Sequence, residues 1–145
     1  MSVFTPAEIE YLQNQSLGRL ATVGPDGLPH VAPVTFRLNT DEDAIDIGGI
    51  GFADTKKWHD ANGNPKVAFL VDDVVRDPRR ARAVEIRGVA ETHDSGGDEI
   101  NPRFPNFVNF VPEFIRIRPT RIVSWGLEED ATGVGFRLHA RSVGA

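Results

Sequence analysis

Several residue types and segments are scarce or missing in this chain of 145 residues, and each absence excludes a class of protein. There is no cysteine, which excludes disulfide frameworks, thiolate nucleophiles and cysteine-ligated zinc or iron–sulfur centres. The 16 lysines and arginines are outnumbered by 21 acidic residues, and a net charge of −5 argues against nucleic acid as a partner. No apolar run approaches the roughly 18 residues of a membrane span, so we expect no membrane partner.

Known catalytic motifs are missing as well. No Gly-x-Ser-x-Gly motif marks a serine nucleophile. No second histidine or carboxylate at metal-site spacing accompanies any of the four histidines, His30, His59, His93 and His139, so we expect no metal site. Asp72-Asp73 at a strand end is a candidate metal or acid–base pair, with a solvated strand end as the alternative. The sequence therefore leaves the catalytic residues unknown.

The length and the N-terminal segment indicate one small cytoplasmic domain. A chain of this size buries a real core without disulfides or metals. The first residues lack a basic region followed by an apolar stretch, so no signal peptide is visible. We expect a single domain over residues 1–145, with a core of about 3–128 and a C-terminal extension of 129–145.

Two short helices are predicted from their start signals. Thr5 can cap the first, with Glu8 at the capping-box position and Gly18 as the stop. The second is expected at Lys56–Asn62, capped by Asp54 or Thr55. Elsewhere the apolar pattern predicts strands at close spacing: Arg19–Val23, Leu28–Leu38, Ala44–Gly48, Val67–Val71, Ala83–Thr92, Phe114–Arg118, Arg121–Trp125 and Phe136–Arg141. This order is typical of an antiparallel barrel or sandwich.

Four segments carry more specific expectations. Pro29 and Pro33 indicate that the second strand is an edge or bulged strand, because proline cannot donate to a ladder. The unbroken apolar run Val67–Val71 predicts a strand buried on both faces, and Asp73–Arg82 a charged loop. In the proline-rich stretch 93–112, three phenylalanines either pack on a second subunit or fold over the chain's own core: Phe104, Phe107 and Phe110.

A candidate anion site lies between the third strand and the second helix. The glycine-rich turn that begins at Gly48 can present backbone N–H groups to a phosphate, although it matches no nucleotide fingerprint. Lys56 and Lys57 stand in the first helical turn, where helix N–H groups, the dipole and two ammonium groups would point at one place. Trp58 either stacks on a planar ring or anchors the helix. The alternative is a solvated lysine pair.

Taken together, these segments resemble the pyridoxamine 5′-phosphate oxidase-like split-barrel superfamily. Within it, the chain is most similar to small actinobacterial enzymes that use the deazaflavin coenzyme F420. The resemblance covers about residues 3–128 and rests on these segments in order: Gly18–Val23, Gly24–Gly27, Leu28–Val34, Lys56-Lys57, Asn64–Asp73 and Ile86–Glu91.

The resemblance implies a mostly β fold, a six-stranded antiparallel split β-barrel (the FMN-binding split barrel) with short flanking helices. It further implies a homodimer with a cofactor at the subunit interface. Pro33, Val34 and Thr35 would line the edge of the ring. The phosphate would be held by Thr55, Lys56 and Lys57, with Lys57 the strongest match, while Gly48 and Trp58 remain candidate cofactor contacts from the sequence pattern.

Three functions remain open on this reading. The first is an F420-dependent reductase that transfers a hydride to an unsaturated small molecule such as an enone, a polyketide or a tetrapyrrole. The second is an FMN-dependent oxidoreductase or oxidase, since the lysine pair suits either phosphate. The third is a non-catalytic protein that binds a flavin or haem. Without a nucleophile or metal motif, an enzyme of this kind must rely on a cofactor for its chemistry.

Overall fold

The structure is a computed structural model that describes residues 1–50, 52–77, 79–100, 110–128 and 138–144. The expected Phe104, Phe107 and Phe136 lie outside these residues. The helices are α1 (Pro6–Gln13) and α2 (Lys56–Gly63), with short 3-10 turns η1 (Phe52–Asp54) and η2 (Gly97–Glu99). The strands are β1 (Leu17–Val23), β2 (Pro29–Asn39), β3 (Ala44–Gly48), β4 (Lys66–Val75), β5 (Arg80–His93), β6 (Phe114–Trp125) and β7 (Leu138–Ser142).

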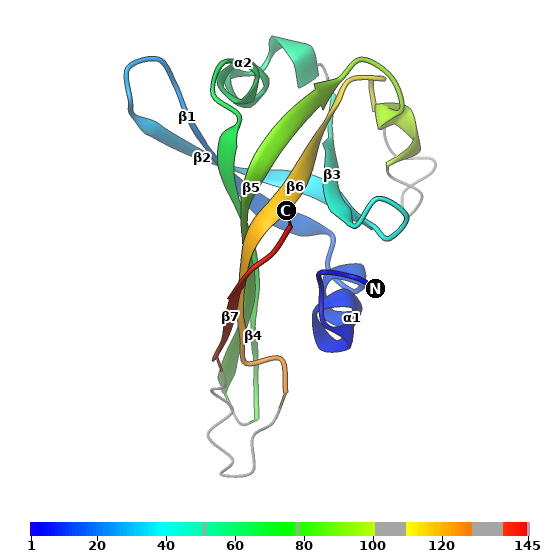
Figure 1. Cartoon of the computed structure of the whole chain (residues 1–145), viewed down its shortest axis with the longest axis vertical. Helices are drawn as coiled ribbons and strands as arrows, with labels where there is room; N and C mark the ends of the chain where they lie inside the picture. The colour runs from blue at the N-terminus through cyan, green and yellow to red at the C-terminus, as the bar shows by residue number, and fades with distance from the viewer. Residues whose placement is uncertain (51, 78, 101–109, 129–137, 145) are drawn as a thin grey trace.

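All strand pairs are antiparallel, in the order β3-β2-β1-β4-β5-β6-β7. A further pairing of β3 with β6 closes the first six strands into a barrel and leaves β7 outside it. Figure 1 shows α2 at one end of the barrel and α1 beside the long arm formed by β4 to β7. The predicted mostly β fold, a six-stranded antiparallel barrel with short flanking helices, is confirmed.

The core lies inside the barrel because alternate residues of each strand point inward. Two aromatic rings, Phe36 and Phe69, meet edge to face there with centroids 5.2 Å apart. Around them lie fully buried aliphatic side chains: Leu20, Ile45, Ile47, Ile86, Ile115, Ile117 and Ile122. The alternation also holds in β4, where Val67, Phe69 and Val71 are buried and the residues between them are half-buried. The expectation that this strand is buried on both faces is therefore wrong.

Several strand bounds differ from the sequence prediction, first where charged residues were taken to indicate a loop. Asp73 and Arg82 face each other as register partners on β4 and β5, so the expected charged loop is instead the end of a hairpin. Their ion pair, at 2.6 Å, offsets the charge that would otherwise disfavour strand pairing. The two strands expected at 114–118 and 121–125 form the single strand β6, with a bulge opposite Arg87 and Gly88.

Pro29 and Pro33 lie in a part of β2 that forms an edge of the sheet. β2 pairs with β1 from Pro29 to Thr35 and with β3 only from Thr35 to Asn39. The part that holds Pro29 and Pro33 therefore has a neighbour on one side, and the missing N–H groups break no ladder there. The predicted edge is confirmed, and Figure 1 shows this end of the β1–β2 hairpin projecting from the barrel.

Helix α1 begins as predicted and ends earlier. Thr5 and Glu8 form both hydrogen bonds of a capping box. The helix ends at Gln13, and Gly18 belongs to β1, so Gly18 is not the stop. Its lack of a side chain serves packing, because a Cβ there would lie 2.3 Å from the Phe69 ring.

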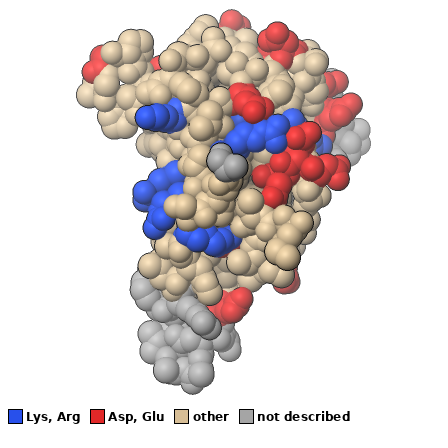
Figure 2. Space-filling model, in the orientation of Figure 1, with Lys and Arg blue, Asp and Glu red and all other residues tan. Residues whose placement is uncertain are grey.

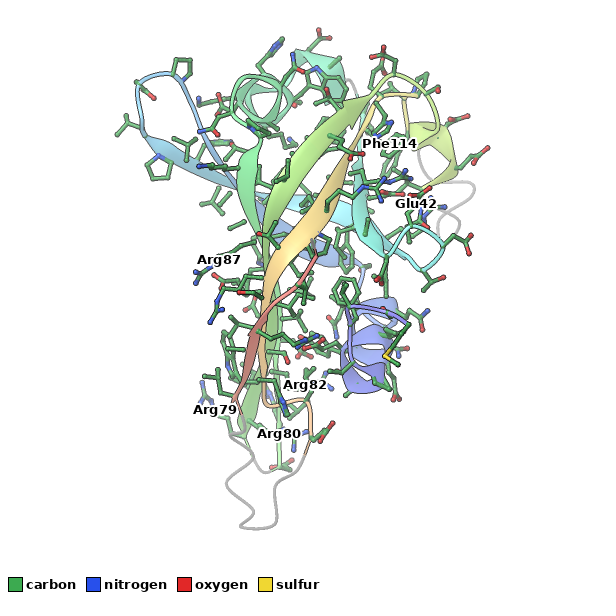
Figure 3. All side chains as sticks on the ribbon, in the orientation of Figure 1. Glu42, Arg79, Arg80, Arg82, Arg87 and Phe114 are labelled. Atoms are coloured by element: carbon green, nitrogen blue, oxygen red, sulfur yellow. The ribbon has the colours of Figure 1, made fainter. Side chains whose placement is uncertain are left out.

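Charged side chains tie the outer surface of the barrel together. Arg118 on β6 donates to Glu42, in the turn before β3, and to Glu91 on β5. Figure 2 shows acidic and basic side chains intermixed in this region, and Figure 3 labels Glu42 within it. None of the helices in the described part of the chain is long and apolar enough to cross a membrane.

Candidate cofactor site

The site expected at the start of α2 is built on the Thr55 cap. The Thr55 hydroxyl accepts from the Trp58 N–H at 3.3 Å and donates to the Phe52 carbonyl at 2.7 Å. The predicted cap is confirmed, but these two bonds occupy the hydroxyl. The Trp58 N–H is thus taken by the cap, whereas the N–H groups of Lys56 and Lys57 have no partner within the helix and remain the natural anion donors.

The two lysines of this turn do not converge. Lys56 folds back along α2, and its Nζ lies 2.9 Å from Oδ2 of Asp60, one turn later. Asp60 is only 5% exposed and also accepts from the Thr22 hydroxyl at 3.3 Å. Both groups lie against Gly24, where an added Cβ would sit 3.1 Å from each. Lys56 therefore joins α2 to the end of β1.

Lys57 points the other way. Its Nζ lies over the Phe52 ring, 5.6 Å from the centroid. No carboxylate of the described residues lies within ion-pair distance of it, so its charge is available to an anion at the helix start. Trp58 is buried and packs edge to face on Phe52 with centroids 5.7 Å apart. The structure thus shows Trp58 as the anchor of α2, the second of its two predicted roles.

The residues expected along the ring lie on both sides of β2. Pro33 is exposed and Thr35 half-buried on the outer face of the barrel. Val34 points inward and is only 5% exposed, so it offers a ring its backbone alone. Thr35 is the register partner of Gly48 on β3, which brings these two predicted residues together.

Gly48 itself is covered. A Cβ at this position would lie 3.0 Å from Phe110 and 3.2 Å from Ile100, both from the segment between β5 and β6. Phe110, one of the three phenylalanines singled out in the sequence, therefore packs on its own chain. In the structure Gly48 permits this close packing and lies at the end of the β2–β3 register, opposite Thr35.

Asp60 and Thr22 are the residues near this site that sequence reasoning missed. The i,i+4 spacing of Lys56 and Asp60 was a usable signal, because such residues share a helix face. Nothing near Thr22 in the sequence indicates its contact with Asp60, since 38 positions separate them.

The Asp72-Asp73 pair does not form a joint site. Asp73 binds Arg82 and accepts from the Tyr11 hydroxyl at 2.9 Å, whereas Asp72 lies on the opposite face and pairs with Arg19 at 3.5 Å. Burial and the Asp73 carboxylate raise the pKa of Tyr11 far above its usual value, so it stays protonated. Figure 3 labels Arg82 on the lower part of β5. In the chain as described, no three metal-ligating side chains cluster.

A shallow hollow lies on the outer face near Pro33; most of its lining is apolar, and the charged residues Arg19, Asp72 and Glu85 border it. Its volume is about 420 Å³. Arg19, the register partner of Pro33, borders it together with side chains from β1, β2 and β4 that include Ala21, Val31, Ala68 and Leu70. Val31 is 63% exposed although apolar.

Comparisons with known proteins agree with this architecture. The family model described as pyridoxamine 5′-phosphate oxidase matches residues 4–104. A 5a,11a-dehydrotetracycline/5a,11a-dehydrooxytetracycline reductase of Streptomyces rimosus subsp. rimosus is 44% identical over 98% of this chain and 94% of its own.

Two solved structures share the fold at lower identity. An F420 reductase is 27% identical, covering 81% of this chain and 98% of its own, with a TM-score of 0.63. A conserved hypothetical protein of Mycobacterium tuberculosis is 26% identical over 99% of this chain and 94% of its own, with a TM-score of 0.66.

These matches assign the chain to an enzyme class and a family. The relationship to a named reductase over almost the whole length makes it an oxidoreductase. The family model spans more than half of the chain, and the barrel topology agrees with it. The chain belongs to the pyridoxamine 5′-phosphate oxidase family.

Proposed function

We propose that this protein is a reductase that uses the deazaflavin coenzyme F420 to reduce an unsaturated small molecule. The observation that carries the proposal is the 44% identity to a reductase of tetracycline intermediates over nearly the full length of both chains. The substrate class is an electron-poor double bond, as in an enone of a polyketide. The F420 reductase that shares the fold supports the choice of coenzyme.

The residues present fit such a coenzyme. Lys57 has no ion-pair partner among the described residues and stands in the first turn of α2, so it would hold a phosphate together with the N–H groups there. Pro33 and Thr35, with outward side chains, and Val34, through its backbone, would contact the ring. Trp58 keeps the helix start in place through its contact with Phe52.

The chain's contribution to the reaction is binding and orientation. When bound, the coenzyme supplies the hydride, which is the chemistry that the protein's own side chains lack. Once covered by a second chain, the hollow near Pro33 would keep water from the reacting carbon, and phosphate contacts at the start of α2 would hold the ring in place. A proton must also arrive, from water or a side chain.

We further propose that the active unit is a cytoplasmic homodimer. Outward apolar side chains of β1, β2 and β4 line the hollow beside Pro33, and a second copy would cover them. A ring lying on Pro33 and Thr35 would then be enclosed between the two chains.

Coenzyme titrations test the proposal directly. Purified protein would be titrated separately with F420, FMN and haem, with fluorescence quenching or absorbance as the readout. We expect tight binding of F420. Tight binding of FMN without F420 would instead establish the FMN-dependent alternative, and haem binding alone would establish a carrier.

Turnover separates an enzyme from a binding protein. Chemically reduced F420 would be mixed with the protein and a panel of enones, including dehydrotetracycline-type polyketides. We expect reoxidation above the protein-free rate with at least one acceptor. Binding of F420 without any such acceleration across the panel would favour sequestration over catalysis.

A further inference from the structure

The Lys56–Asp60 pair determines how much positive charge the start of α2 offers to an anion. A lysine in the first turn is opposed by the helix dipole, and an i,i+4 pair with the lysine first is the weaker orientation. Stabilisation of α2 is therefore not the reason why the pair forms. The reason lies in Asp60, whose carboxylate is nearly buried and needs compensation.

Lys56 is the cation that Asp60 requires. Its Nζ contacts both carboxylate oxygens, at 2.9 and 3.2 Å, while Thr22 supplies one neutral hydrogen bond at 3.3 Å. If Lys56 turned to a ligand, the Asp60 carboxylate would keep only the Thr22 hydroxyl among its side-chain partners in the described residues. Leaving the buried Asp60 carboxylate without a cation costs more free energy than the half-exposed Lys56 gains by binding a phosphate.

Lys57 is free of this constraint. Its ammonium lies over Phe52, away from Asp60, with no carboxylate of the described chain in ion-pair range. The helix start thus has two lysines, but one of them is neutralised by its own helix. Of the two lysines at this helix start, only Lys57 has no ion-pair partner among the described residues.

We infer that Asp60 is a specificity-determining residue, which makes the site selective for a phosphodiester over a phosphomonoester. This rests on the proposed function, because it concerns which coenzyme the same site accepts. A phosphodiester, as in F420, carries one negative charge that Lys57 matches. A phosphomonoester, as in FMN, is close to a dianion at neutral pH and would find no second unpaired lysine in the first turn of α2.

Releasing Lys56 tests the inference. Asp60→Asn keeps the shape and the Thr22 contact but removes the charge that holds Lys56. We expect FMN to bind at least about threefold more tightly, from one added charge-assisted hydrogen bond, with a smaller gain for F420. The gain should disappear in the double variant Asp60→Asn with Lys56→Ala.

A matched control isolates the mechanism from net charge. Asp54→Asn removes one charge from an exposed position two residues before Lys56. We expect little change in the ratio of FMN to F420 affinity. Equal effects of the two asparagine variants, or a gain that persists without Lys56, would overturn the inference.

Inorganic phosphate provides a readout that does not need a coenzyme. Phosphate would be titrated into the protein at pH 7.5, and binding would be measured from the NMR chemical shifts of the Lys57 and Trp58 amides. Thermal unfolding would verify that each variant is folded. Tighter phosphate binding by Asp60→Asn, lost in the double variant, supports the inference even if F420 fails to bind. Unchanged phosphate binding by Asp60→Asn would contradict it even if F420 binds.

Discussion

Glu8 is a fully buried carboxylate on α1 whose partners come from three parts of the chain. It accepts from the Thr5 N–H, from the Ser124 hydroxyl at 2.6 Å and from the Arg141 guanidinium on β7. Burial raises the pKa of Glu8, but these bonds together hold it below the usual value. The ionised form is thus the one that the fold stabilises.

Glu8→Gln tests this buried pair. Because it leaves Arg141 without its counter-charge, and Arg141 is partly exposed, we expect a loss of about 2–3 kcal/mol in the free energy of unfolding at pH 7. A depressed folded-state pKa contributes stability above the ordinary pKa, about 4.3, that is lost as pH falls through the folded value. Urea unfolding should therefore show the variant and the parent converging in acid.

The exposed Glu10 on the same helix is the control. Glu10→Gln should change stability by less than about 0.5 kcal/mol at either pH. An equal loss in both variants at pH 7 would mean that helix charge, and not the pair with Arg141, is responsible.

Lys57→Ala tests whether Lys57 binds the phosphate of the coenzyme. Loss of one charge-assisted hydrogen bond should weaken F420 binding by about 1–3 kcal/mol, measured by fluorescence titration. Lys66→Ala, at an exposed position at the start of β4, removes the same charge and should bind normally. Unchanged affinity in Lys57→Ala would place the phosphate elsewhere.

At the scale of elements, the bulge between β5 and β6 depends on Gly88. A Cβ there would lie 2.3 Å from the Arg118 carbonyl oxygen, which is backbone and cannot turn aside. The glycine thus allows β5 to approach β6 where the register shifts.

Gly88→Ala should therefore lower the free energy of unfolding by about 1–3 kcal/mol or prevent folding. Val89→Ala, at the exposed neighbouring position, is the matched control and should cost less than half as much. Chemical denaturation measures both. A fully stable Gly88→Ala variant would mean that the strands separate without cost at this point.

At the scale of the whole molecule, the outer face of β1, β2 and β4 decides the proposed dimer. Leu70 points into the apolar hollow there, so Leu70→Glu would bury a charge in the interface. We expect the mass measured by light scattering to fall from dimer to monomer, with coenzyme affinity lost as well. Ile50→Glu makes the same chemical change at an exposed site outside the hollow and should remain dimeric. A monomeric parent protein would refute this arrangement.

The sequence by itself determined the features that depend on neighbours a few residues apart. The Thr5–Glu8 capping box, the Thr55 cap, the exact span Ala44–Gly48 and the prolines at the free side of β2 are local signals of this kind. Close spacing of alternating strands indicated an antiparallel barrel or sandwich, and the resemblance to the split-barrel family then selected the barrel that the structure has.

Only the tertiary structure decided which charges are available. Lys56 and Lys57 are adjacent in sequence, yet packing of α2 against β1 assigns one to Asp60 and leaves the other beside Phe52. Likewise, Glu8 meets Arg141 across 133 positions. Such partners follow from how the strands close into a barrel, and the free energy of burying a charge then determines which pairs must form.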